Sequence, residues 1–98
     1  MPFEITCGFK PRIIIMEQET GGTSWMQMTY NADINPNIIA QTYYYNSGST
    51  KVVTIYDMTQ TAHGSNMIYE VTNTGFNGHI GSQTGTEFNG IYHITCIE

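Results

Sequence analysis

Short runs of β-branched and aromatic residues, each ended by glycine, proline or asparagine, recur along the whole chain. Runs of this length, separated by turn-forming residues, predict β-strands joined by short connections. The run 3–7 alternates apolar and polar residues, whereas 12–16 is apolar on both faces and predicts a central strand. The predicted strands cover 3–7, 12–16, 24–30, 38–45, 51–56, 67–71 and 91–97.

The connections carry the usual turn residues. Gly21-Gly22 and the 46–49 segment predict tight turns, and the second of these joins 38–45 to 51–56 as a hairpin. The segment 73–78 also predicts a turn, because it contains two asparagines and two glycines. Loops are expected at 31–37, 59–66 and 81–87, with a helical turn within 59–67 as an alternative.

Composition supports the same fold class. The chain contains no leucine, and only 11% of its residues are charged, while threonine occurs fourteen times and asparagine eight times. Threonine suits a pleated sheet, and asparagine and glycine suit turns. With 98 residues the chain has the size of one domain. We therefore predict a single all-β domain over 1–98, an antiparallel β-sandwich or flattened barrel of about seven or eight short strands.

Charge and hydropathy exclude two classes of partner. The chain has eight carboxylate side chains but only three basic residues, Lys10, Arg12 and Lys51, so its net charge is −5. A nucleic-acid binder needs a basic surface that displaces counterions from phosphates, so nucleic-acid binding is not expected. No apolar run has the length of a membrane span, and the N-terminus lacks a signal-peptide pattern. A mildly acidic surface of uncharged polar residues is common on extracellular and virion proteins.

Catalytic and metal-binding patterns are missing from the sequence. The histidines are His63, His79 and His93, and a metal or acid–base role would need them to converge with carboxylates such as Asp33, Asp57, Glu70 or Glu87. His79 and His63 fall in glycine-rich segments where an exposed polar residue is ordinary, and His93 alternates with isoleucines and is expected to be partly buried. No nucleophile elbow, phosphate loop or paired carboxylate frame occurs. We predict no enzyme activity, no catalytic residue, no metal and no cofactor.

The cysteines allow two interpretations. Cys7 and Cys96 lie near the two ends of the chain, each in an Ile-Thr-Cys triplet. If the first and last strands pair, the sulfurs become neighbours, and a disulfide closing so long a loop would add roughly 4–5 kcal/mol. Alternatively, both are small buried apolar residues, as free cysteines usually are. No Cys-x-x-Cys spacing indicates zinc.

Aromatic residues mark the candidate binding surface, which consists of Trp25, Tyr43, Tyr44 and Tyr45. Asn46 follows directly after the strand that contains the three tyrosines and belongs to the same candidate surface. Sugars bind to aromatic platforms and amides, both of which this chain offers. In a strand, however, Tyr43 and Tyr45 share one face and Tyr44 takes the other, so at least one face should pack in the core or in a subunit interface.

Three stretches together resemble small β-rich modules of phage tail and fibre proteins. The first is Gly8-Phe9-Lys10-Pro11 followed by an apolar strand, after which Trp25 stands in the next strand. The second is the Gly75-Phe76 turn, and the third is the aromatic final strand that contains Tyr92. The resemblance covers nearly the whole chain through short motifs, and such modules commonly end much longer chains.

The resemblance implies a virion or prophage structural module, oligomeric and placed near the host-recognition machinery. It also implies that Gly8 and Pro11 form a turn and that Phe9 and Phe76 fill the core. The leading hypothesis is therefore a self-associating module of a phage tail, fibre or baseplate, located in the virion, that contacts other virion proteins and a host surface polysaccharide. The alternatives are a free-standing carbohydrate-binding domain and, third, a small metal-dependent enzyme.

Overall fold

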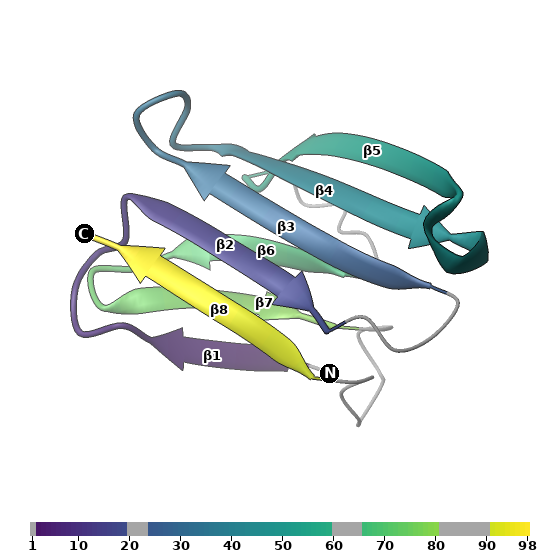
Figure 1. Ribbon diagram of the computed structural model, residues 1–98. Coiled ribbons are helices and arrows are strands. Elements are labelled where there is room, and N and C mark those ends of the chain that lie inside the picture. Colours follow the sequence, from purple (N-terminus) through teal and green to yellow (C-terminus); the bar gives the residue numbers. More distant parts are fainter. Residues whose placement is uncertain (1, 20–23, 60–65, 81–90) are drawn as a thin grey trace.

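The computed structural model describes residues 2–19, 24–59, 66–80 and 91–98. These residues form eight strands in two antiparallel sheets that pack face to face (Figure 1). The smaller sheet has the order β1-β7-β6, with β1 at Pro2–Thr6, β7 at Gly75–His79 and β6 at Met67–Val71. The larger sheet has the order β5-β4-β3-β2-β8, with bounds Thr50–Asp57, Ile38–Tyr45, Trp25–Asn31, Ile13–Gln18 and Tyr92–Ile97.

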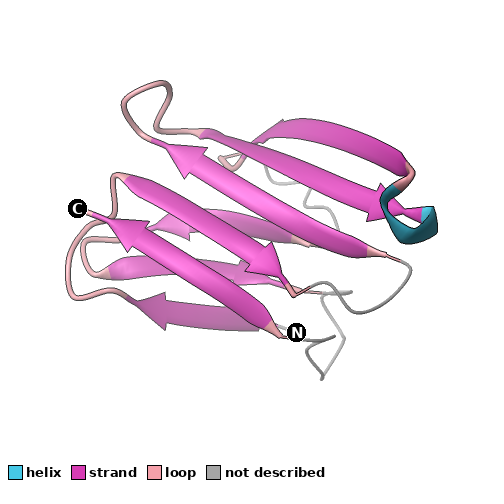
Figure 2. Ribbon diagram, viewed as in Figure 1, coloured by secondary structure: helices cyan, strands magenta, loops and turns pink. Residues whose placement is uncertain are grey.

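The predicted all-β class is confirmed, and of the two predicted shapes the chain adopts the sandwich. All seven predicted strands are present, with ends shifted by at most two residues. Figure 2 shows one short helical element among the described residues, the 3-10 turn η1 at Asn46–Gly48. The Gly21-Gly22 turn, the loop at 81–87 and most of the segment 59–67 lie outside the described residues.

The predicted hairpin between β4 and β5 is confirmed. The two strands pair without interruption from Ile38 opposite Asp57 to Tyr45 opposite Thr50. The chain reverses through positive φ angles of 52° at Asn46, 57° at Ser47 and 92° at Gly48. Asparagine and glycine tolerate this left-handed backbone better than other residues, so the turn chemistry agrees with the sequence.

The prediction of a turn at 73–78 is wrong from Gly75 onward. Residues Gly75–His79 form β7, the central strand of the smaller sheet, and the reversal is confined to the residues just before it. A Cβ atom at Gly75 would lie 1.8 Å from the backbone oxygen of Ile5, and one at Gly78 would lie 2.3 Å from that of Met67. These glycines therefore serve the close approach of neighbouring strands rather than a turn.

The core lies between the sheets and is built from alternate residues of their strands. Phe76 is buried and meets the Phe3 ring edge-to-face, with centroids 6.0 Å apart at 85°. The expectation that Phe9 also fills the core is wrong, because Phe9 is only half-buried and lies outside the cluster. The largest fully buried side chains are those of Phe76, Ile14, Met16, Met28, Ile39, Ile68, Ile80 and Pro11.

Tyr56 links the two sheets by hydrogen bonds. From β5 its hydroxyl accepts a bond from the backbone N–H of Ile68 at 2.9 Å and donates to the Ile68 carbonyl at 3.3 Å, so it serves both main-chain groups of a buried β6 residue. Burial raises the pKa of the Tyr56 hydroxyl well above its usual value near 10, despite the opposing effect of the Ile68 hydrogen bond.

We expect Tyr56→Phe to lower the free energy of unfolding by roughly 1–3 kcal/mol, because it leaves two buried main-chain groups without their partner. Urea titration measures the loss, and Tyr45→Phe on the exposed end of β4 is the control, expected to change little.

Since folding raises the Tyr56 pKa, the contribution of Tyr56 to the free energy of unfolding is complete below pH 10 and is lost as the pH rises beyond that value. Stability should therefore fall less steeply above pH 10 in Tyr56→Phe than in the wild type; equal slopes would contradict this assignment.

Candidate functional site

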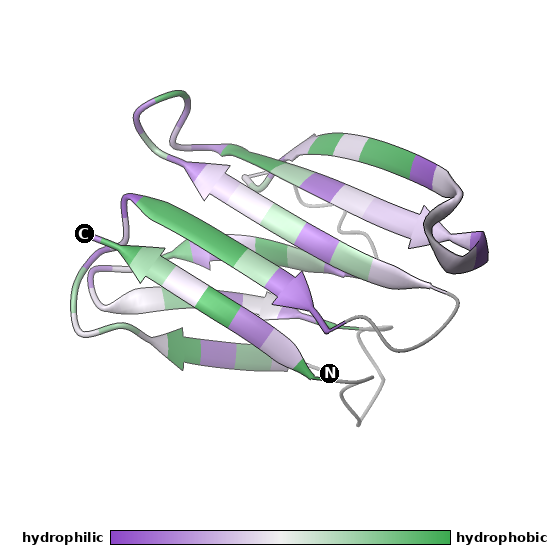
Figure 3. Cartoon of the chain, viewed as in Figure 1, coloured by the Kyte–Doolittle hydropathy of each residue, from purple (hydrophilic) through white to green (hydrophobic). Residues whose placement is uncertain are grey.

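Strand β5 is the most exposed regular element among the described residues. It forms one edge of the larger sheet, paired with β4 on one side, and no described strand pairs with its other side. Six of its eight residues are exposed, including Val52 at 46%, Val53 at 54% and Ile55 at 66%. Figure 3 shows an apolar stretch along β5 and a hydrophilic end next to η1. Lys51 belongs to that end of the strand. An extended apolar edge of this kind is a template for pairing with another strand.

The hydrogen-bonding pattern between β4 and β5 determines which main-chain groups of β5 face away from β4. Just past the strand, the Met58 N–H donates to the Asn37 carbonyl at 2.9 Å, so the main-chain groups of Met58 point toward the β4 side. In an antiparallel pair successive residues alternate in direction, and the β4–β5 register has no shift. Therefore Val52, Thr54 and Tyr56 bond to β4, while Lys51, Val53, Ile55 and Asp57 direct their N–H and C=O groups outward.

The three consecutive tyrosines divide between the two faces of β4, as predicted. Tyr43 and Tyr45 stack at 6.0 Å and 18° on the face that also carries buried Ile39 and Gln41. Tyr44 lies on the opposite face, where its ring stacks on Trp25 of β3 at 5.2 Å and 17°. All four rings are at least partly exposed, and Tyr45 reaches 40%.

Trp25 is held by its surroundings as well as by Tyr44. A Cβ atom placed on Gly48 would lie 2.9 Å from the Trp25 ring, so this ring lies against the turn of the β4–β5 hairpin. Asn46 belongs to the same turn, where its side-chain Nδ2 donates to Thr50 Oγ1 at 3.2 Å. Asn46 therefore has a local structural role, and it does not line any of the cavities described below.

A cavity of about 290 Å³ brings three of the predicted aromatic residues together with amides. Trp25, Tyr43 and Tyr45 line it, and Tyr44 does not. Sequence reasoning missed its other lining residues; the inward alternation of Tyr92 with Ile94 and Cys96 was the available signal for one of them. These remaining lining residues are Gln18, Ser24, Met26, Asn66, Ile80 and Tyr92.

Two amide groups fix the wall of this cavity. The buried Gln41 donates through Nε2 to the backbone carbonyl of Asn66, and Asn66 donates through its side-chain Nδ2 to the Tyr43 hydroxyl. Burial raises the pKa of Tyr92, and the neighbouring Tyr43 hydroxyl adds to the effect. The Tyr92 hydroxyl is therefore neutral at physiological pH.

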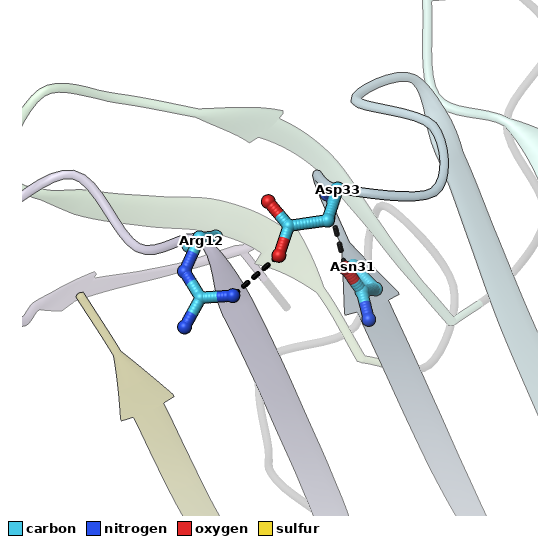
Figure 4. Close-up of polar contacts among 3 residues, drawn as sticks. All are labelled: Arg12, Asn31 and Asp33. Atoms are coloured by element: carbon cyan, nitrogen blue, oxygen red, sulfur yellow. Dashed lines mark hydrogen bonds and ion pairs between the residues drawn. The ribbon is translucent and has the colours of Figure 1, made fainter.

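A larger cavity of about 630 Å³ is lined by Lys10, Arg12 and the loop between β3 and β4. Arg12 donates through Nη1 to Asp33, and the Asp33 N–H donates to Asn31 Oδ1 at 3.0 Å (Figure 4). Both members of the ion pair are exposed, so it contributes little stability. Because Asp33 neutralises Arg12, this cavity is a weak candidate for an anion site.

The histidines correct the sequence expectations. His79 is not an exposed loop residue, since it is buried in β7 with its ring 6.1 Å from Tyr69. His93, expected to be partly buried, is exposed on β8. His63 lies outside the described residues. Within the described ranges no three of the histidine, cysteine, aspartate and glutamate side chains form a group suited to a metal ion.

The two cysteines are neighbours, although the first and last strands do not pair. β1 and β8 belong to different sheets, and each is an edge strand. Both residues are half-buried free thiols. Burial, a hydrogen bond with Cys7 and the charge of Cys7 together raise the pKa of Cys96 to about 12. Cys96 is therefore a poor nucleophile at neutral pH, and the disulfide stays a prediction.

No protein-family model, curated protein or solved structure matches the chain. In the part of the chain that the structure describes, no helix has the length and apolar character needed to span a bilayer.

Proposed function

We propose that this protein is a non-enzymatic structural module that acts by self-association, and that it belongs to a phage or prophage tail, fibre or baseplate. The observation that carries the proposal is β5, an edge strand of eight residues with three exposed aliphatic side chains. Soluble proteins usually protect such edges with charge, proline or a covering segment. An edge that keeps Val52, Val53 and Ile55 exposed is suited to pairing with another chain.

The phage assignment rests on the resemblance of the Gly8-Phe9-Lys10-Pro11 opening, the Gly75-Phe76 segment and the aromatic last strand. Two structural features agree with it. Gly8 adopts a φ of 86° and Pro11 is buried, so this opening forms a specific turn between β1 and β2. Phe76 is completely buried in the core.

Mass spectrometry of purified phage particles from a producing host tests whether the protein is located in the virion. Absence of the chain from the particles would overturn the phage assignment.

Analytical ultracentrifugation tests self-association. We expect the wild type to sediment as an oligomer and Ile55→Lys to sediment as a monomer, because a charge at the centre of β5 opposes burial of the edge. Ile34→Lys is the matched control: Ile34 is 84% exposed in the loop between β3 and β4, and its replacement should leave the oligomer intact. A wild type that remains monomeric at its highest soluble concentration would overturn the proposal.

A second candidate function, glycan binding, is favoured by the 290 Å³ cavity. Tyr43 and Tyr45 line this cavity beside Gln18 and Asn66, whereas Trp25 lines it at the end of β3 with its ring stacked on Tyr44 on the other face of the sheet. Rings that pack on the apolar face of a sugar, with amides that bond its hydroxyls, form the usual chemistry of a carbohydrate site.

A glycan array followed by calorimetry tests this second function. We expect Tyr45→Ala to abolish binding of the array hit, because the exposed ring of Tyr45 lines the cavity. Tyr44→Phe is the control, since Tyr44 lies on the other face of the sheet and phenylalanine keeps the stack on Trp25. No signal on the array, or equal losses in both variants, would remove this cavity as a glycan site.

A further inference from the structure

We infer that two copies of the chain pair through β5, antiparallel and with a two-fold axis at Thr54, so that their larger sheets become one continuous sheet. The inference rests on the proposed self-association and specifies its interface. Three observations carry it: the exposed edge, the direction of its main-chain groups and the order of its side chains.

The hydrogen-bonding direction restricts the register. Lys51, Val53, Ile55 and Asp57 direct their main-chain groups outward, so only these residues form hydrogen-bonded pairs with a second strand. A two-fold axis at Thr54 pairs outward residues only with outward residues. A shift by one residue would place outward groups opposite inward ones, and the ladder would be lost.

Charge selects among the remaining registers. With the axis at Thr54, Lys51 faces the partner's Asp57, and symmetry forms the same pair twice. A shift by two residues in either direction removes both ion pairs, because Lys51 would then face the partner's Ile55 or the partner's Thr59. Opposite charges on facing residues stabilise a strand pair, and the strand carries one charge of each sign, near its two ends.

The apolar side chains agree with the same register on both faces. On the outer face of the sheet Val53 lies opposite the partner's Ile55, and on the inner face Val52 lies opposite the partner's Tyr56. Val52, Val53 and Ile55 are the exposed aliphatic residues of β5, so pairing covers all three. Aliphatic and aromatic pairs of this kind are favourable across strands. Because β5 is complementary to itself, a second copy fits it better than an unrelated strand.

Asp57 is prepared for this contact. Its Oδ1 accepts hydrogen bonds from the Thr59 N–H at 2.8 Å and from Thr59 Oγ1 at 2.5 Å, which holds the carboxylate at the end of the strand and lowers its pKa. Both bonds go to Oδ1, so Oδ2 can accept a bond from a lysine of a second copy.

Charge reversal tests the register. We expect Lys51→Asp and Asp57→Lys each to weaken self-association at least about 30-fold, since each replaces two attractive pairs by two repulsive ones. An equimolar mixture of the two variants should restore the dimer, because both facing pairs are again opposite in charge. Lys10→Asp is the matched control, with the same charge change in the loop between β1 and β2. Sedimentation measures all four samples, and circular dichroism verifies that each variant is folded.

The outcomes separate this inference from the proposed function. A wild type that is monomeric overturns both. An oligomer that tolerates Lys51→Asp, or a mixture that fails to associate, overturns the β5 register while leaving self-association in place. Dissociation of the Lys10→Asp control would show a net-charge effect and would also overturn the register. If β5 paired only with a strand of another protein, the assignment of a second copy as its partner would be wrong.

Cysteine cross-linking gives a second readout that does not depend on charge. On the axis, Thr54→Cys brings two sulfurs into the range of a disulfide, since facing Cα atoms of a non-hydrogen-bonded pair lie about 4.5 Å apart. Val53→Cys is offset from its own copy by about 7–8 Å and should cross-link poorly. Both variants are made with Cys7→Ser and Cys96→Ser. Faster cross-linking of Val53→Cys than of Thr54→Cys would overturn the axis at Thr54.

Discussion

Replacement of Gly75 by alanine is expected to lower the free energy of unfolding by at least about 3 kcal/mol. The new Cβ atom would lie 1.8 Å from the carbonyl oxygen of Ile5 and 2.8 Å from its carbonyl carbon, both of them backbone atoms of the neighbouring strand β1. Backbone cannot yield as a flexible side chain can, so β1 and β7 would have to separate. A domain of this size has only about 5–15 kcal/mol of total stability. Urea unfolding followed by circular dichroism measures the loss.

Gly8→Ala is the control for Gly75→Ala. Gly8 has a φ of 86°, and a Cβ atom there meets nothing within 4 Å, so alanine costs only the strain of a left-handed backbone, about 1–2 kcal/mol. A larger loss for Gly75 than for Gly8 identifies strand approach as the cause. Equal losses would show that loss of glycine flexibility accounts for both, and would contradict the role assigned to Gly75.

Replacement of Phe76 by alanine is expected to cost about 3–5 kcal/mol. The Phe76 side chain is completely buried on β7, and it packs edge-to-face on Phe3 of β1. Removing it leaves a cavity between the two sheets, because the surrounding strands are held in register by their ladders. For a domain of this length such a loss lowers the melting temperature by at least about 12 °C. Differential scanning calorimetry measures the shift.

Phe9→Ala is the matched control for Phe76→Ala. The resemblance to phage modules assigns both phenylalanines to the core, whereas in the structure Phe9 is half-buried and lies outside the core cluster. We therefore expect Phe9→Ala to cost clearly less than Phe76→Ala. A cost as large as that of Phe76→Ala would mean that the turn between β1 and β2 contributes to the core after all.

More of the fold than of the candidate site could be predicted from the sequence. Alternation located the strands that bury one face, and asparagine and glycine located the β4–β5 turn. The sequence prediction is wrong at β7. Glycine marks turns elsewhere in the chain, but in β7 it allows neighbouring strands to approach closely. The split of the tyrosines between two faces of β4 followed from the two-residue period alone.

The candidate interface was only partly accessible to sequence reasoning. The sequence predicts self-association but does not point to the 51–56 segment, because Val52, Val53 and Ile55 are also what a buried strand would contain. The cavity likewise collects Gln18, Asn66 and Tyr92 from three separate parts of the chain. Nothing in their local sequence distinguishes them from ordinary surface or core residues.

The fold class follows from the sequence, because β-branched residues, turn chemistry and the two-residue period act locally along each segment. Packing between distant segments sets which strand lies at an edge, which glycines face a neighbouring backbone and which distant residues share a cavity. These properties depend on the order of strands within the sheets, and that order arises from contacts between residues far apart in the chain.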